Sequence, residues 1–177
     1  MKFMKKYEIT DETKLYLVGY RIDADRTDEY WDFYTLYIDG ERAIDFDGFP
    51  IIFFNVDHME KALKASDCGC EHLPLPSVDD LEDMDIAQAV SDLMGEDRTD
   101  NINIVACLNN LLDFLVFLPE VRVHQEYKHR MRQAANHFTF NYEIKEYFEN
   151  NGVSRIELVQ AMEWAVGATL LWAKFVY

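Results

Sequence analysis

The sequence predicts an α+β protein in which a sheet forms first along the chain and helices follow. Two observations support this fold class. Aromatic and β-branched residues are frequent in the first 55 residues, where turn signals separate them into short runs. Beyond residue 79, apolar residues recur at helical spacing over long segments. We therefore expect an N-terminal antiparallel β-meander of about four strands plus a helix, covered by a C-terminal bundle of about five helices.

The N-terminal part contains clear strand and turn signals. Asp39-Gly40 is a hairpin signal, and Asp47-Gly48 is a second break a few residues later. A helical pattern follows over 56–65, with Asp57 suited to its N-terminus. The expected strands cover 15–22, 31–38, 42–46 and 51–54.

The C-terminal part reads as helical throughout. Pro119 ends one expected helix, and Asn151-Gly152 is typical of a helix C-terminus. Ser154 with Glu157 three residues later forms a capping box ahead of a long apolar run. The five helices are expected over 79–94, from a cap at Thr99 or Asp100 to Leu118, over 120–137, over 142–150, and from Ser154 to Phe175.

The chain has the length of one domain, and we expect a single α+β domain over 1–177. Within it, residues 1–65 form the sheet-rich part and residues 79–177 the helical part. Residues 66–78 contain Gly69, Pro74 and Pro76, which prevent regular structure, and are expected to form a loop or linker.

The charge is strongly negative and unevenly distributed. The formal net charge is −16, and residues 1–100 hold 25 acidic and 10 basic side chains. An apolar fraction of 49% excludes a disordered acidic tail, because disorder requires low hydrophobicity as well as high charge. The same charge argues against direct binding of nucleic acid and against docking on an anionic membrane. We expect a basic protein partner instead, and the sequence gives no sign of an oligomeric state.

The N-terminus has basic residues but no apolar segment behind them, because Glu8, Asp11 and Glu12 follow at once. The apolar run 164–173 is about half the length that a membrane span requires. The three cysteines are too few for a disulfide scaffold. We therefore expect a protein of the reducing cytoplasm.

A short string of metal-ligand types occurs in the loop. Cys68, Cys70 and His72 would supply two thiolates and an imidazole within five residues, and zinc is the metal that such ligands favour. The spacing differs from the usual two-residue gap between paired cysteines, and no second ligand pair follows. The alternative is a loop whose thiols are close by chance, with no cofactor.

Two acidic stretches with neighbouring aromatic residues are the expected partner-binding surface. We expect the aromatic anchors to be Tyr30, Trp31, Phe33 and Tyr34, because aromatic side chains supply much of the affinity at protein interfaces. A capped, solvated helix end is the structural alternative for the second stretch. The candidate residues are Asp23, Asp25, Asp28, Glu29, Tyr30, Trp31, Asp79, Asp80, Glu82, Asp83 and Asp85.

These features favour a binding protein over an enzyme. The sequence contains no Gly-rich phosphate loop, no nucleophile elbow and no dinucleotide-binding fingerprint. The leading hypothesis is an immunity or antitoxin-type inhibitor that neutralises a basic, nuclease-like partner through its acidic, aromatic-containing surface. One alternative is a DNA mimic that inhibits a DNA-binding enzyme. Another is a metal-dependent enzyme that uses Cys68, Cys70 and His72.

Overall fold

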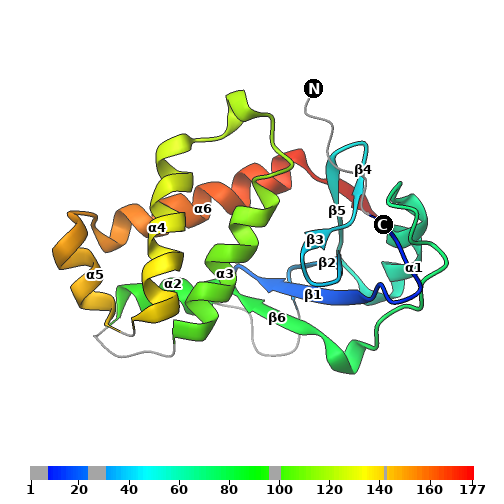
Figure 1. Cartoon of the computed structure of the whole chain (residues 1–177), viewed down its shortest axis with the longest axis horizontal. Coiled ribbons are helices and arrows are strands. Elements are labelled where there is room, and N and C mark those ends of the chain that lie inside the picture. Colours follow the sequence, from blue (N-terminus) through cyan, green and yellow to red (C-terminus); the bar gives the residue numbers. More distant parts are fainter. Residues whose placement is uncertain (1–7, 24–30, 96–100, 142) are drawn as a thin grey trace. The chain divides into compact units, whose positions relative to one another are not determined.

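The structure is a computed structural model of the whole chain, and it describes residues 8–23, 31–95, 101–141 and 143–177 (Figure 1). The described residues contain seven strands in a mixed sheet and six α-helices, which confirms the α+β class. They divide into two compact units. The sheet unit comprises Met1–Tyr20, Asp28–Asp83 and Trp172–Tyr177, and the helical unit comprises Arg21–Thr27 and Met84–Leu171. A single domain over 1–177, with helices covering the sheet, stays a prediction.

The sheet unit is built around strands that pair in the order β4-β5-β2-β1-β6, while β3 pairs with β2 and β7 pairs with β5. The pairs β1–β2, β2–β3, β2–β5 and β4–β5 are antiparallel, and β5–β7 is parallel. The strands are β1 (Leu15–Arg21), β2 (Phe33–Ile38), β3 (Arg42–Ala43), β4 (Asp45–Phe46), β5 (Phe49–Phe53), β6 (Glu82–Asp85) and β7 (Lys174–Val176).

Both Asp-Gly pairs form tight turns. Asp39 and Gly40 have φ values of 52° and 70°, and Asp47 and Gly48 have φ values of 52° and 80°. Positive φ at two successive residues is the geometry of a type I′ hairpin turn, which matches the twist of the strands that it joins. The hairpin predicted at Asp39-Gly40 is confirmed, and Asp47-Gly48 closes a second hairpin between β4 and β5.

The core of the sheet unit lies between the sheet and α1 (Met59–Ala65), which contacts β2, β5 and β7. The core includes Leu17, Leu36, Ile51, Phe53, Leu63 and Cys70. Burial of their apolar surface is the main favourable contribution to folding. A 3-10 turn (Val56–His58) precedes α1, so the helix predicted over 56–65 begins three residues later than expected.

Two segments that the sequence predicts as helix are strands. Residues 79–94 were expected to form one helix, but Val78–Asp80 is a 3-10 turn, Glu82–Asp85 is β6, and α2 (Ile86–Met94) begins only afterwards. The backbone of β6 pairs beside β1, and this tertiary pairing overrides the local helical pattern.

The predicted C-terminal helix likewise ends early, at Trp172, because Lys174–Val176 forms β7. In this strand Lys174 pairs with Ile51, and Phe175 pairs with Ile52. An apolar run does not reveal from periodicity alone whether it is helix or buried strand. The sheet therefore has seven strands among the described residues, compared with about four expected.

The helical unit contains five helices within the described ranges. Helix α3 contacts both α2 and α4, and α4 contacts α5. Residues such as Ile104, Leu108, Met131, Phe138 and Tyr147 are buried. The helices are α2, α3 (Asn101–Phe114), α4 (Gln125–Phe140), α5 (Ile144–Asn151) and α6 (Arg155–Trp172, of which Trp172 belongs to the sheet unit).

Several helix ends match the sequence signals. The Ser154 hydroxyl accepts from the Glu157 N–H at 3.2 Å, and the Ser154 N–H donates to the Glu157 carboxylate at 2.7 Å, which is the predicted capping box. Gly152 follows α5 with a φ of 63°, as expected for a helix C-terminus. The predicted cap at Thr99 or Asp100 lies outside the described residues.

Other boundaries differ from the prediction. Helix α3 ends at Phe114 rather than Leu118, because the Val116 and Phe117 N–H groups form tighter turns onto carbonyls three residues earlier. Helix α4 begins at Gln125, where the His124 imidazole caps it by accepting from the Tyr127 N–H. In the part of the chain that the structure describes, no helix is long and apolar enough to cross a membrane.

Candidate functional site

The acidic edge is a stretch of exposed carboxylates on the sheet unit, formed by Asp79, Asp80, Glu82 and Asp83. The first two lie in the 3-10 turn, where the Ser77 hydroxyl accepts from the Asp79 N–H at 3.2 Å. The last two lie in β6, which ends the strand order of the sheet (Figure 1). The turn and the strand therefore present four carboxylates along one short segment.

Trp31 is joined to this edge although it lies 52 residues away in the sequence. Its indole Nε1 donates a hydrogen bond to the Asp83 carboxylate at 2.8 Å. The indole is partly exposed, and its ring lies 6.0 Å from the Tyr34 ring. The structure thus brings together an aromatic residue and an acid, both of which were predicted from the sequence as partner-binding residues.

Gly19 in β1 makes room for the indole. A Cβ atom at this position would lie 2.6 Å from Trp31 Cδ1 and 2.7 Å from Cγ, closer than nonbonded carbon atoms approach one another. Any larger residue would therefore displace the Trp31 ring. Glycine is disfavoured inside strands, and close approach of another group is a recognised reason for its presence there.

Most carboxylates of the acidic edge have no side-chain partner that would offset their negative charge. Within the described ranges, Asp79, Asp80 and Glu82 have no side-chain ion pair or hydrogen bond. The cations Arg42 and Lys64 of the sheet unit pair with Asp45 and Glu60 instead. Their charge is therefore directed to solvent.

The other predicted partner-binding residues are placed differently. Asp85 belongs to the helical unit, where its carboxylate caps α2 by accepting from the Gln88 N–H at 2.8 Å and lies 3.9 Å from Arg21. Asp23 is exposed and belongs to the same unit. Asp25, Asp28, Glu29 and Tyr30 lie outside the described residues.

Phe33 and Tyr34 are not exposed anchors, contrary to expectation. The Phe33 ring stacks on Tyr20 at 4.5 Å, and the Tyr34 ring stacks on Phe53 at 5.7 Å. Every residue of β2 is buried, because both faces of this central strand are covered. Burial also raises the pKa of the Tyr34 hydroxyl. These two aromatic residues stabilise the sheet, whereas Trp31, another predicted anchor, is partly exposed.

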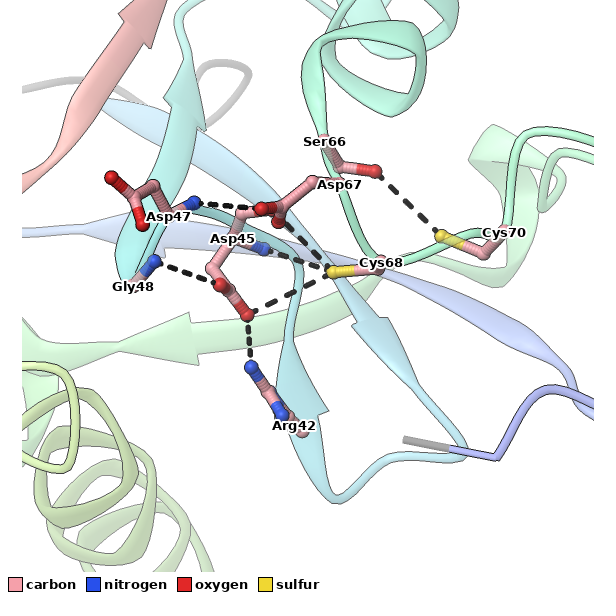
Figure 2. Close-up of polar contacts among 8 residues, drawn as sticks. All are labelled: Arg42, Asp45, Asp47, Gly48, Ser66, Asp67, Cys68 and Cys70. Atoms are coloured by element: carbon pink, nitrogen blue, oxygen red, sulfur yellow. Dashed lines mark hydrogen bonds and ion pairs between the residues drawn. The ribbon is translucent and has the colours of Figure 1, made fainter. Parts of the chain in front are cut away.

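A second polar site, the Asp45 cluster, comprises Arg42, Asp45, Asp67 and Cys68 (Figure 2). The Asp45 side chain is nearly inaccessible at 6% exposure, and its carboxylate pairs with the Arg42 guanidinium and accepts from the Gly48 N–H at 3.1 Å. Pairing and hydrogen bonding are what a buried charge requires. The cluster therefore holds the β4–β5 hairpin against β3.

The loop after α1 attaches to the same hairpin. The Asp67 N–H donates to the Asp45 carbonyl at 3.1 Å, and the Asp67 carboxylate accepts from the Asp47 N–H at 3.1 Å. The Cys68 sulfur accepts from the Asp45 N–H at 3.3 Å and lies 3.5 Å from the Asp45 carbonyl oxygen. These contacts join residues 20 or more apart in the sequence.

The string Cys68, Cys70 and His72 is not arranged as a metal site. The Cys68 sulfur faces Asp45, the fully buried Cys70 sulfur lies 3.8 Å from the Ser66 hydroxyl, and His72 is exposed. Within the described ranges, no group of three or more His, Cys, Asp or Glu side chains is placed to hold a metal ion. Each of the two thiols, however, influences the pKa of the other.

The thiol pair has unequal acidities. Hydrogen bonding from Cys68 and from the Ser66 hydroxyl lowers the pKa of the Cys70 thiol to about 7, although burial and the nearby Glu71 charge oppose this. The same hydrogen bond, together with burial, raises the pKa of the Cys68 thiol, while the Asp45 N–H acts in the opposite direction. The pair therefore loses its first proton more readily than an ordinary thiol.

Sequence reasoning did not find the Asp45 cluster. Arg42 and Asp45 are three residues apart, and their opposite charges are the one local signal in the sequence. Cys68 lies 23 residues from Asp45, and no local pattern indicates that this loop returns to the hairpin.

Comparison with protein-family models, with curated proteins and with solved structures finds no match to this chain.

Proposed function

We propose that this protein is a non-enzymatic binding module of the immunity or antitoxin type, which neutralises a basic, nuclease-like partner in the cytoplasm. The observation that carries the proposal is the acidic edge with Trp31 beside it. Three exposed carboxylates without cationic partners adjoin a partly exposed indole that Asp83 holds in place. This combination suits a basic surface with a shallow apolar recess.

The two parts of the surface contribute differently to binding. Unpaired carboxylates attract a basic partner and accelerate encounter, and they act less strongly at high salt. An indole that becomes buried at an interface contributes affinity by removing a large apolar area from water. The hydrogen bond to Asp83 restricts the indole before binding, which lowers the entropy cost of fixing it.

The proposal is tested by isolating a partner and measuring its affinity for defined variants. The tagged chain captures proteins from its native host, and the recovered basic protein is produced separately for titration calorimetry at low and high salt. We expect the triple variant Asp79→Asn, Asp80→Asn, Glu82→Gln to bind at least about tenfold more weakly at low salt and to lose most of the salt dependence.

The matched control removes the same charge from the helical unit through Glu120→Gln, Glu143→Gln and Glu163→Gln, three exposed acids. We expect this control to bind like the unmodified chain. Recovery of no basic partner, or equal weakening by both triple variants, would refute the proposed surface. If the partner binds DNA and DNA competes at the acidic edge, the result favours the DNA-mimic alternative.

A further inference from the structure

We propose that Cys68 and Cys70 form a reversible oxidation site, at which reaction with a low-molecular-weight disulfide such as oxidised glutathione closes a disulfide between them. This site is separate from the acidic edge and does not depend on the proposed function. All three cysteines are free thiols in the structure, so the description above is that of the reduced form.

The backbone between the two cysteines is compatible with a disulfide. Two residue steps span at most about 7 Å between Cα atoms, and a disulfide needs about 4.4–6.8 Å. The intervening Gly69 has a φ of 77°, which bends the chain and shortens that span. In the reduced form the Cys68 sulfur points to Asp45 and the Cys70 sulfur points to Ser66 (Figure 2). Rotation of the Cys68 side chain away from Asp45 is the movement that bond formation requires.

The two thiols are suited to successive steps. Cys68 is the partly exposed sulfur, whereas Cys70 is fully buried. A soluble oxidant therefore meets Cys68 first. The Asp45 N–H donates to the Cys68 sulfur at 3.3 Å, and this contact stabilises the thiolate that forms when Cys68 loses its proton to water.

The reaction balances without a bound cofactor. The Cys68 thiolate attacks one sulfur of oxidised glutathione, whose sulfur–sulfur bond breaks, and the departing glutathione thiolate takes a proton from water. Cys70 then loses its proton to water, and its thiolate attacks the Cys68 sulfur of the mixed disulfide and releases the second glutathione. Two protein thiols are oxidised to one disulfide, and one glutathione disulfide is reduced to two thiols.

Oxidation would alter the Asp45 cluster directly. In the reduced form, the Cys68 sulfur is within 3.5 Å of the Asp45 carbonyl oxygen and 3.8 Å of its carboxylate (Figure 2). A disulfide sulfur carries no proton to donate, and rotation toward Cys70 moves it away from Asp45. The Asp67 contacts to Asp45 and Asp47 remain, so the loop loses one of its attachments to the β4–β5 hairpin.

The first experiment uses the unmodified protein. It is equilibrated in glutathione buffers of increasing oxidised fraction, treated with N-ethylmaleimide and digested with trypsin. Residues 65–98 form one peptide that contains both cysteines, whereas Cys107 lies in the peptide 99–122. We expect the first peptide to become lighter by two hydrogen atoms and to take up no maleimide, and dithiothreitol to reverse this. A peptide that always carries two maleimides would overturn the proposal.

The second experiment separates the two roles. In Cys70→Ser we expect the mixed disulfide on Cys68 to persist at least about tenfold longer than in the unmodified chain, because the intramolecular thiol that resolves it is absent. Cys107→Ser, which changes a buried thiol of the helical unit, is the matched control and should oxidise normally. Equal persistence in Cys70→Ser and in the unmodified chain would overturn the assigned order, and circular dichroism verifies that each variant is folded.

Discussion

The two units use their carboxylates in different ways. In the helical unit, Asp85 caps α2 and pairs with Arg21, while Glu126 and Glu157 both pair with Arg130. In the sheet unit, the Asp45 carboxylate is buried and paired, whereas Asp79, Asp80 and Glu82 of the acidic edge are exposed and have no side-chain partner among the described residues. Net charge alone therefore does not identify a binding surface. What distinguishes the acidic edge is the lack of local partners for three of its acids among the described residues.

The largest effect is expected from breaking the buried ion pair between Arg42 and Asp45 in the sheet unit. An exposed ion pair of the helical unit serves as the comparison. Arg42→Met keeps the apolar stem but leaves the Asp45 carboxylate buried without its cation. We expect a loss of about 2–3 kcal/mol in the free energy of unfolding, somewhat below the value for fully buried pairs because Arg42 retains 21% exposure. Urea denaturation measures this.

Lys145→Ala is the control for this change, because Lys145 and Glu149 form an exposed pair across one turn of α5. It should alter the free energy of unfolding by no more than about 0.5 kcal/mol. If both substitutions have the same effect, Asp45 is better solvated than its burial indicates, and the contrast between the units does not hold.

Smaller effects on the free energy of unfolding are expected from two Gly→Ala substitutions, one destabilising and one stabilising. Gly19→Ala forces the Trp31 ring away from β1, and we expect a loss of about 1–2 kcal/mol, typical of overpacking. Gly167→Ala in α6 meets no atom within 4 Å and should stabilise by up to about 1 kcal/mol, because alanine is the better helix former. Thermal unfolding compares the two variants.

The Gly19 variant also tests the acidic edge. Displacement of the indole breaks its hydrogen bond to Asp83, so tryptophan fluorescence should change in Gly19→Ala and remain unchanged in Gly167→Ala. A Gly19→Ala protein with unaltered fluorescence and stability would mean that the Trp31 ring does not lie over β1.

The smallest expected effect concerns the pH at which the Cys70 thiol ionises. Because the pKa of the Cys70 thiol is lowered to about 7, the ultraviolet absorbance of a thiolate should increase through pH 7, below the pH range in which an ordinary thiol ionises. Ser66→Ala removes one hydrogen bond to the Cys70 sulfur, so the midpoint should move to higher pH.

The charged groups near the pair include Asp45 and Arg42 on the hairpin side and Asp67 and Glu71 on the loop (Figure 2). Lys145→Ala, remote in sequence and in the other unit, should leave the thiolate titration unchanged. A midpoint in the ordinary thiol range for the unmodified chain, or no shift in Ser66→Ala, would contradict the hydrogen bonding described for Cys70.

Local signals predicted the parts of the fold that depend on neighbouring residues. The Asp39-Gly40 hairpin, the Gly152 helix end and the Ser154–Glu157 capping box each depend on residues within a few positions. Their geometry follows from backbone preference and from one or two hydrogen bonds, so it can be read directly from the sequence.

The remaining features depend on contacts between distant segments. β6 consists of Glu82, Asp83, Met84 and Asp85, of which the three acids are uncommon in strands, and it forms because β1 offers a pairing edge. The Trp31–Asp83 and Asp45–Cys68 contacts span 52 and 23 positions. Trp31 and the acids could therefore be predicted separately as binding residues, but the contact between Trp31 and Asp83 could not be predicted from the sequence.

The position of β7 has a consequence for biosynthesis. Ile51 pairs with Lys174 in the parallel β5–β7 ladder, so β5 leaves the ribosome long before its partner strand has been translated. Until then, one edge of β5 lacks the backbone partners that Lys174–Val176 provide. Pairing between such distant segments is intrinsically slow, because a long loop must close first. The nascent chain thus assembles the sheet in two stages, which are separated by the translation of α2 through α6.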